Sequence, residues 1–172
     1  MTVPVLETAR LRLRGHRLDD FQAACRLWSD PLVTKYIGGK PSTQQQTWAR
    51  LLAYLGHWSV LEYGYWAIEH AASRVFIGEV GFADFKRDID PSMKDAPELG
   101  WALSTDFHGK GYGTEAVAAA IAWGDERFGH ARTVCMISPQ NLASTRVAAK
   151  CGYVAFKETT FNDRPTIFYE RR

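Results

Sequence analysis

The residues best suited to bind a charged ligand form a short glycine-rich segment past the middle of the chain. Gly109, Gly111 and Gly113 alternate with Lys110 and Tyr112, and a helical pattern begins directly afterwards. Glycine lets the main chain approach a ligand closely and adopt positive φ. The first turn of a helix offers amides that have no partner within the helix. These amides and the Lys110 ammonium suit a pyrophosphate, and a glycine-rich turn that binds nothing is the simpler alternative.

Two familiar phosphate-binding loops do not match this segment. The chain has no G-x-x-x-x-G-K-[ST], which excludes a Walker-type nucleotide site. The dinucleotide fingerprint G-x-G-x-x-G also fails, because position 116 is Ala116. The segment moreover follows an apparent antiparallel pair of strands, whereas the dinucleotide loop follows the first strand of a parallel sheet.

Other catalytic groups are not arranged in recognisable patterns. No histidine belongs to an H-x-H or H-E-x-x-H motif, so a metal site is not predicted. The absence of G-x-S-x-G argues against a serine hydrolase. The three cysteines, Cys25, Cys135 and Cys151, include no CxxC pair. Their odd number favours reduced thiols over a disulfide framework, and Cys135 lies in an apolar run that predicts a core position.

Length and composition predict one globular domain spanning residues 1–172. The chain is 46% hydrophobic and 13% aromatic, which excludes intrinsic disorder. A net charge of +2 does not suggest a nucleic-acid partner. The N-terminal residues lack the pattern of an export signal, and no apolar stretch is long enough to span a bilayer. We therefore expect a cytoplasmic protein without a membrane partner.

Hydrophobic periodicity predicts alternating strands and helices. Thr43 and Gln46 match a capping box at a helix start, and Gly152 is suited to end the last helix. The segment 90–97 is a polar loop bounded by prolines. The predicted strands are 10–14, 63–69, 75–85, 98–103, 133–137, 153–156 and 166–169, and the predicted helices are 18–28, 43–58, 113–128 and 141–151.

The glycine-rich segment resembles the signature of the GCN5-related N-acetyltransferase (GNAT) family, [QR]-x-x-G-x-[GA]. In the run 108–113 the two small positions match at Gly111 and Gly113. His108 stands where the family has Gln or Arg, so a hydrogen-bond donor is kept but permanent charge is lost. The blocks 8–14, 98–103, 109–116 and 141–153 also resemble, in order, the ribosomal-protein (Rim-type) subgroup.

This resemblance implies an α/β (α+β) fold with a mixed, mainly antiparallel sheet. The sheet is expected to splay between its fourth and fifth strands, 98–103 and 133–137, and to be flanked by about four helices. Acetyl-CoA is the implied co-substrate, without a metal. Its pyrophosphate is expected at the amides of 110–114, and its pantetheine arm in the splay. The residues predicted to bind it are Leu103, Ser104, His108, Gly109, Lys110, Gly111, Tyr112, Gly113, Thr114, Asn141 and Ser144.

The resemblance also implies acyl transfer by direct attack of an amine on the thioester in a ternary complex. Many relatives carry a tyrosine that protonates the thiolate, but the corresponding position here is Ala148. Ser144 is the expected substitute, and its alternative role is helix capping, as it is for Asn141. Glu98 is the first candidate for the general base, with a solvated strand-end charge as the alternative. Glu79 and Asp163 are second choices.

The acceptor is expected to be a small-molecule or peptide amine, and nothing in the sequence selects among amines. Tyr36, Trp101 and Phe82 are candidate lining residues of its pocket. A homodimer is left open. Because the tyrosine is missing and His108 is substituted, a non-catalytic acetyl-CoA-binding regulatory module is the second hypothesis. A generic nucleotide-binding protein is the third.

Overall fold

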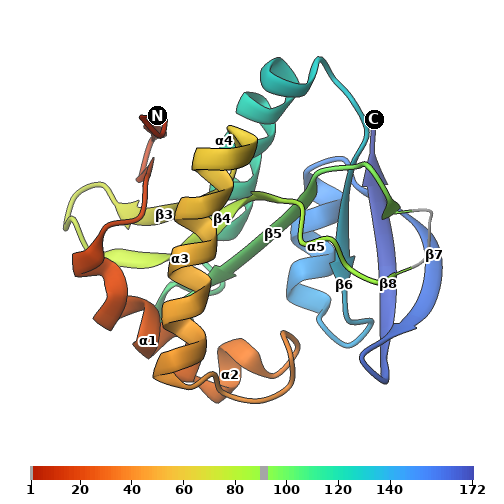
Figure 1. Ribbon diagram of the computed structural model, residues 1–172, viewed down its shortest axis with the longest axis horizontal. Coiled ribbons are helices and arrows are strands. Elements are labelled where there is room, and N and C mark those ends of the chain that lie inside the picture. The colour runs from red at the N-terminus through yellow and green to blue at the C-terminus, as the bar shows by residue number, and fades with distance from the viewer. Residues whose placement is uncertain (1, 90–92) are drawn as a thin grey trace.

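A single mixed sheet of eight strands, with helices on both faces, forms the molecule (Figure 1). The computed structural model describes residues 2–89 and 93–172. The strands are β1 (Leu6–Glu7), β2 (Leu11–Arg14), β3 (Tyr65–His70), β4 (Phe76–Ala83), β5 (Glu98–Leu103), β6 (Thr133–Ile137), β7 (Val154–Phe161) and β8 (Arg164–Arg171). The helices are α1 (Phe21–Ser29), α2 (Pro31–Thr34), α3 (Gln44–Leu61), α4 (Tyr112–Phe128) and α5 (Leu142–Lys150). The predicted fold class is confirmed.

The sheet has the order β1-β2-β3-β4-β5-β6-β8-β7, and among the described strands only β5 and β6 are parallel neighbours. Their pairing is limited to Glu98 opposite Val134, at the start of both strands. Beyond this point the two strands diverge (Figure 1). The predicted splay is therefore present, and it leaves the inner edge of β5 without a neighbouring strand.

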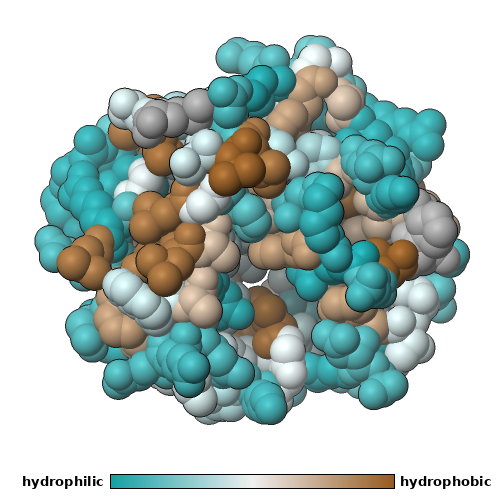
Figure 2. All heavy atoms as spheres, viewed as in Figure 1, coloured by the Kyte–Doolittle hydropathy of each residue, from teal (hydrophilic) through white to brown (hydrophobic). Residues whose placement is uncertain are grey.

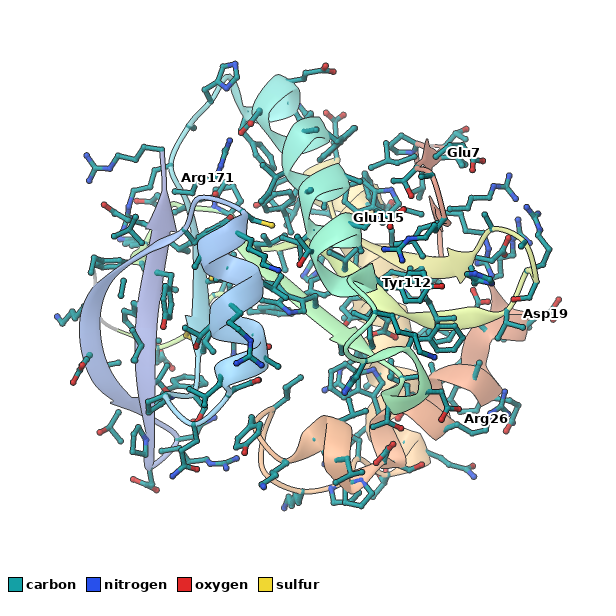
Figure 3. The ribbon with its side chains drawn as sticks, turned by 180° about the vertical axis from the view of Figure 1, so that it is seen from behind. Glu7, Asp19, Arg26, Tyr112, Glu115 and Arg171 are labelled. Carbon is teal, nitrogen blue, oxygen red and sulfur yellow. The ribbon has the colours of Figure 1, made fainter. Side chains whose placement is uncertain are left out.

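Helices α1, α2 and α3 cover one face of the sheet, and α4 and α5 cover the other (Figures 1 and 3). The core lies mainly between the sheet and α4, where small residues of the helix meet large strand residues. Ala116, Val117 and Ala120 are fully buried there, as are Trp66 and Phe82. Small side chains on α4 let the helix approach the sheet closely, which brings its N-terminus to the end of β5.

Helix α3 begins with the predicted capping box. The Gln46 amide donates to Thr43 Oγ1 at 3.2 Å, and the Thr43 amide donates to Gln46 Oε1 at 2.8 Å. Helical spacing predicts a core stripe formed by Trp48, Leu51, Leu52, Leu55 and Trp58. This prediction is wrong in part, because Trp48, Leu52 and Leu55 are exposed by 39–48%. The sheet instead takes the adjacent face of the helix, which includes Leu51, Tyr54 and Trp58. Figure 2 shows apolar residues along the outer side of α3.

Other differences concern short or terminal elements. The strand β1, with two residues, and the helix α2, with four, are too short to be predicted from hydrophobic periodicity. Pro31 begins α2, where its missing N–H costs nothing. The last two strands are predicted at 153–156 and 166–169. The observed strands β7 and β8 extend further toward the turn that connects them. Residues 90–92 of the predicted polar loop lie outside the described part of the chain.

Candidate active site

The glycine-rich segment joins the end of β5 to the N-terminus of α4. Gly109 and Gly111 have φ of +72° and +83°, a region that L side chains rarely adopt. Gly111 is the N-cap, and the first helical bond runs from the Glu115 amide to its carbonyl. Among the described residues, the amides from 110 to 114 donate to no protein acceptor. A row of free amides at a helix start is the geometry that an anion such as a diphosphate requires.

An ion pair that the sequence analysis missed holds this loop. Glu115, on the first turn of α4, accepts hydrogen bonds from Thr8 Oγ1, the Arg10 amide and Arg10 Nε at 2.7–2.9 Å (Figure 3). Arg10 also donates to the Lys110 carbonyl at 2.9 Å, and its guanidinium lies 4.3 Å from the centroid of the Tyr112 ring. Burial raises the pKa of Glu115, but these hydrogen bonds outweigh it and leave the pKa below its usual value. The charge of Glu115 is thus neutralised beside the free amides.

The register of β4 and β5 shows which main-chain groups of β5 face the splay. The Ser104 amide donates to the Ile77 carbonyl at 2.8 Å, and the Ser104 carbonyl accepts from the Phe107 amide at 3.0 Å. Alternate residues of an antiparallel strand turn their main chain the other way. Leu103 and Trp101 therefore face the splay, and Ser104 does not. The main chain of Ser104 therefore does not support the prediction that Ser104 binds the co-substrate, since both of its groups already have partners.

His108 connects the loop to the same strand. Its Nε2 donates to the Leu103 carbonyl at 2.8 Å. Within the described chain, Nδ1 of the ring and the amide of Leu103 make no hydrogen bond and remain for a ligand. His108 thus contributes to the positioning of the loop, and its contact with a co-substrate stays a prediction.

Asn141 and Ser144, at the start of α5, differ in the hydrogen bonds that their side chains make. The Asn141 side chain is the cap, since its Oδ1 accepts from the Ser144 amide at 3.1 Å. The Ser144 hydroxyl makes no hydrogen bond within the described chain, and Ser144 lines the central cavity together with Asn141. Helix capping therefore does not explain the Ser144 side chain. Ala148 is fully buried one turn further on.

The central cavity has a volume of about 390 Å³ and lies on the face of the sheet covered by α1 and α3. Figure 2 shows the molecule hollowed at this place. Tyr36 and Trp101 line the cavity as predicted, whereas Phe82 does not. Phe82 is 1% exposed and packs edge-to-face on Phe128 behind the sheet, because its position in β4 turns it toward α4. The volume is typical of a small-molecule site.

Glu98 lies in the cavity wall, but its carboxylate is paired. Arg87 donates to its two oxygens from Nε and Nη2, at 2.8 and 3.0 Å. A bidentate pair of this kind holds both oxygens in place. The alternative reading of Glu98 as a solvated charge does not fit its environment. Asp163, the other exposed candidate, lies in the turn between β7 and β8 outside the cavity lining.

Glu79 lies directly behind the cavity, in the middle of β4, and is 2% exposed. Trp28 Nε1 donates to its Oε2 at 3.0 Å, and both Trp28 and Tyr54 line the cavity. Burial raises the pKa of Glu79 to about 7, against the lowering influence of the Arg50 charge and of hydrogen bonds from Trp28 and Tyr54. A carboxylate with this pKa is suited to exchange protons near neutral pH.

The profile of the Acetyltransferase (GNAT) domain family matches residues 10–154, which include the loop, the splayed strands and most of the cavity lining. The chain belongs to the GNAT acetyltransferase family. The family transfers acetyl groups and uses acetyl-CoA as co-substrate. This GNAT protein is 31% identical, over 95% of its own length and 70% of the relative's, to the FsC-acetyl coenzyme A-N(2)-transacetylase of Aspergillus fumigatus. An acetyltransferase structure from Agrobacterium tumefaciens superimposes with a TM-score of 0.86 at 28% identity, covering 100% of this chain and 96% of that one.

Membership of the Rim-type subgroup is not confirmed, because the similarity to its solved structures is one of fold. The ribosomal L7/L12 α-N-protein acetyltransferase RimL, in complex with coenzyme A, aligns with a TM-score of 0.77 over 98% of this GNAT chain and 97% of its own. The identity is only 18%, so this likeness concerns the fold alone. In the part of the chain that the structure describes, no helix is long and apolar enough to cross a membrane.

Proposed function

We propose that this protein is an N-acetyltransferase that moves the acetyl group of acetyl-CoA to an amine by direct attack in a ternary complex. The observation that carries the proposal is the meeting of three features at β5. Free amides of α4 lie at one end of the strand, the splay exposes its inner edge, and the cavity with Glu79 behind it lies beside it. A thioester placed in the splay then faces an amine placed in the cavity.

The chain's own groups suit coenzyme A. The amides from 110 to 114 and Lys110 bind the diphosphate, and the main chain of Leu103 and Trp101 pairs with the amides of the pantetheine arm, as a strand would. Gly109 and Tyr112 shape the loop, and Asn141 caps α5 on the same side. We propose no metal.

Each chemical step has a candidate group. Glu79 takes the proton of the attacking amine, directly or through one water, because it combines a pKa of about 7 with a place behind the cavity. The Trp101 amide stabilises the negative charge that develops on the carbonyl oxygen. The Ser144 hydroxyl donates to the leaving sulfur. Glu98 is the alternative base, and its pairing with Arg87 makes it the second choice.

The test is an assay of the purified protein with acetyl-CoA and a panel of amines, which measures both free thiol and acetylated amine. We expect thiol release that depends on the amine and equals the acetylated product. Tight binding of acetyl-CoA without transfer to any amine would favour the regulatory module. Competition of acetyl-CoA binding by ATP or NAD would instead indicate a generic nucleotide site.

A further inference from the structure

Two arginines in the cavity wall have no part in the proposed acetyl transfer. Arg50 comes from α3, and Arg164 is the first residue of β8. In both, the Nη1 atom is buried and has no hydrogen-bond partner, and neither side chain forms an ion pair with the rest of the described chain. A buried guanidinium nitrogen without an acceptor is costly. Two such nitrogens in the lining of one cavity indicate that a ligand in the cavity supplies the hydrogen-bond acceptor.

Both guanidinium groups are held in place before any ligand arrives. That of Arg50 lies 3.6 Å from the centroid of a Trp28 ring. Arg164 Nη2 donates to the Lys35 carbonyl at 3.1 Å. Its guanidinium also fills the space beside Gly39, where a Cβ atom would lie 2.1 Å from Nη1. Because these contacts fix the side chains, a ligand that binds them loses little affinity to their ordering.

The charges of the cavity match a monoanion. Arg87 and Glu98 neutralise each other through their bidentate pair. Arg50 and Arg164 remain, with Glu79 as the nearby acid that offsets at most one of them. One positive charge is therefore left for a ligand when Glu79 is ionised. A guanidinium prefers a carboxylate or a phosphate as its partner, and the single residual charge favours the carboxylate.

We infer that the acceptor is a small amino acid, whose carboxylate is bound by Arg50 and Arg164 while its amine faces the thioester. This inference rests on the proposed function and names its substrate class. It distinguishes a free amino acid from the N-terminus of a protein, which has no α-carboxylate next to its amine. Two nearby cations also favour the neutral form of the amine, which is the form that attacks.

The experiment compares the common α-amino acids with their α-carboxamides as acceptors, at saturating acetyl-CoA. We expect at least one acid to have a kcat/KM about 10-fold or more above that of its amide, since the charge-assisted hydrogen bonds from the two arginines are lost in the amide. In Arg50→Gln and Arg164→Gln this ratio should fall to about 3-fold or less. Arg26→Gln is the matched control, because Arg26 is exposed on the outer side of α1 (Figure 3) and the ratio should be unchanged.

A binding measurement tests the inference without relying on catalytic turnover, and it also shows whether each variant is folded. Calorimetric titration of N-acetyl amino acids and their amides into the CoA-bound protein should show the same preference, and CoA affinity reports whether each variant is folded. Arg50→Lys and Arg164→Lys serve where a Gln variant does not fold, and they should keep part of the preference because the charge remains.

The outcomes separate this inference from the proposed function. Acetyl transfer to acids and amides at equal rates would overturn the inference, and so would a preference for acids that persists in both Gln variants. Either result is compatible with the proposed function. O-phosphoethanolamine as the best acceptor assigns the two arginines to phosphate and also overturns it. Selective binding of acids without any transfer supports the carboxylate site and contradicts the proposed function.

Discussion

At the scale of single residues, Glu79 has the environment that a base needs. It is buried in β4, its pKa is raised to about 7 by burial, and it touches Trp28 of the cavity wall. Sequence patterns could not show this, because Glu79 lies in an apolar strand and its burial depends on α1 and α3. Glu98, by contrast, stands at the start of β5, and its carboxylate is paired with Arg87 from the preceding β4–β5 connection.

Replacing Glu79 by Gln should lower kcat by about 10²- to 10⁴-fold, because the proton acceptor is lost while the shape is kept. A base works only when deprotonated, so activity of the unaltered protein should rise with pH through about 7 and then level off. The Gln variant should not show this rise of activity with pH. The test is the pH dependence of kcat at saturating acetyl-CoA. Glu98→Gln is the comparison, and a rise that vanishes there and persists in Glu79→Gln contradicts our choice of base.

Replacing Ser144 by Ala should lower kcat by about 10-fold with little change in acetyl-CoA affinity, since one hydrogen bond to the leaving sulfur is lost. Asn141 remains as the cap of α5, so the folded state should be preserved. Rates measured with a thioester whose thiol leaves more easily should show a smaller effect. A variant that is destabilised yet fully active would assign Ser144 to the helix instead.

At the scale of elements, the junction of β5 and α4 forms the proposed co-substrate site. The strand ends at Leu103, a short 3-10 turn (Thr105–Phe107) follows, and His108 ties the loop back to the strand. Glu115 and Arg10 anchor the first turn of the helix to the N-terminal segment of the chain. These contacts hold the free amides in fixed positions, so that an anion can bind without a rearrangement of the loop.

Gly111→Glu should reduce CoA affinity by at least about 100-fold. A negative side chain there faces the diphosphate, and like charges a few ångströms apart cost several kcal/mol near a surface. Gly129→Glu is the matched control, since Gly129 is at the other end of α4, has φ of +62° and has open space around it. Calorimetric titration with CoA compares the two. Equal affinities in both variants would refute the loop assignment.

At the scale of the whole molecule, a buried ion network joins β2, β3 and the start of α1. Arg14 donates to Asp20 through Nη1 and Nη2, both at 2.8 Å, and to Glu69 through Nε at 2.8 Å. Burial alone would raise the pKa of Asp20, but the hydrogen bonds and charge of Arg14 and the Arg17 amide lower it below the usual value. Asp20 therefore stabilises the fold above its unfolded pKa of about 3.9, and this contribution is lost as the pH falls through the lower, folded value.

Asp20→Asn should reduce the free energy of unfolding by about 3–5 kcal/mol near neutral pH, because Arg14 keeps a buried charge with one partner fewer. The difference from the unaltered protein should narrow in acid, where Asp20 itself becomes protonated. Urea unfolding at several pH values measures both effects. Asp19→Asn should be nearly neutral, as Asp19 is exposed (Figure 3). A similar loss in both variants would show that the network contributes little.

The sequence by itself determined the local features. Glycines at 109 and 111, a capping box at 43–46, a helix end at 152 and β-branched strands follow from preferences that act within a few residues. The family signature at 108–113 and the strand at 98–103 are also recognised from runs of neighbouring residues. The structure brings three of these predicted features together: the free amides of the loop, the exposed edge at Leu103 and the side of the cavity formed by Tyr36 and Trp101.

Only the tertiary structure decided which groups are free. Whether Ser104 or Leu103 faces the splay depends on the phase of pairing with β4, and which face of α3 is buried depends on the sheet beneath it. The pairing of Glu98 with Arg87 depends on how the β4–β5 connection folds back on β5. The cavity also brings together Arg50 and Arg164, which are far apart in sequence and have no acceptor for Nη1 among the described residues. Burial and pairing set the pKa and the availability of a polar group, and both arise from contacts between distant segments that local patterns do not encode.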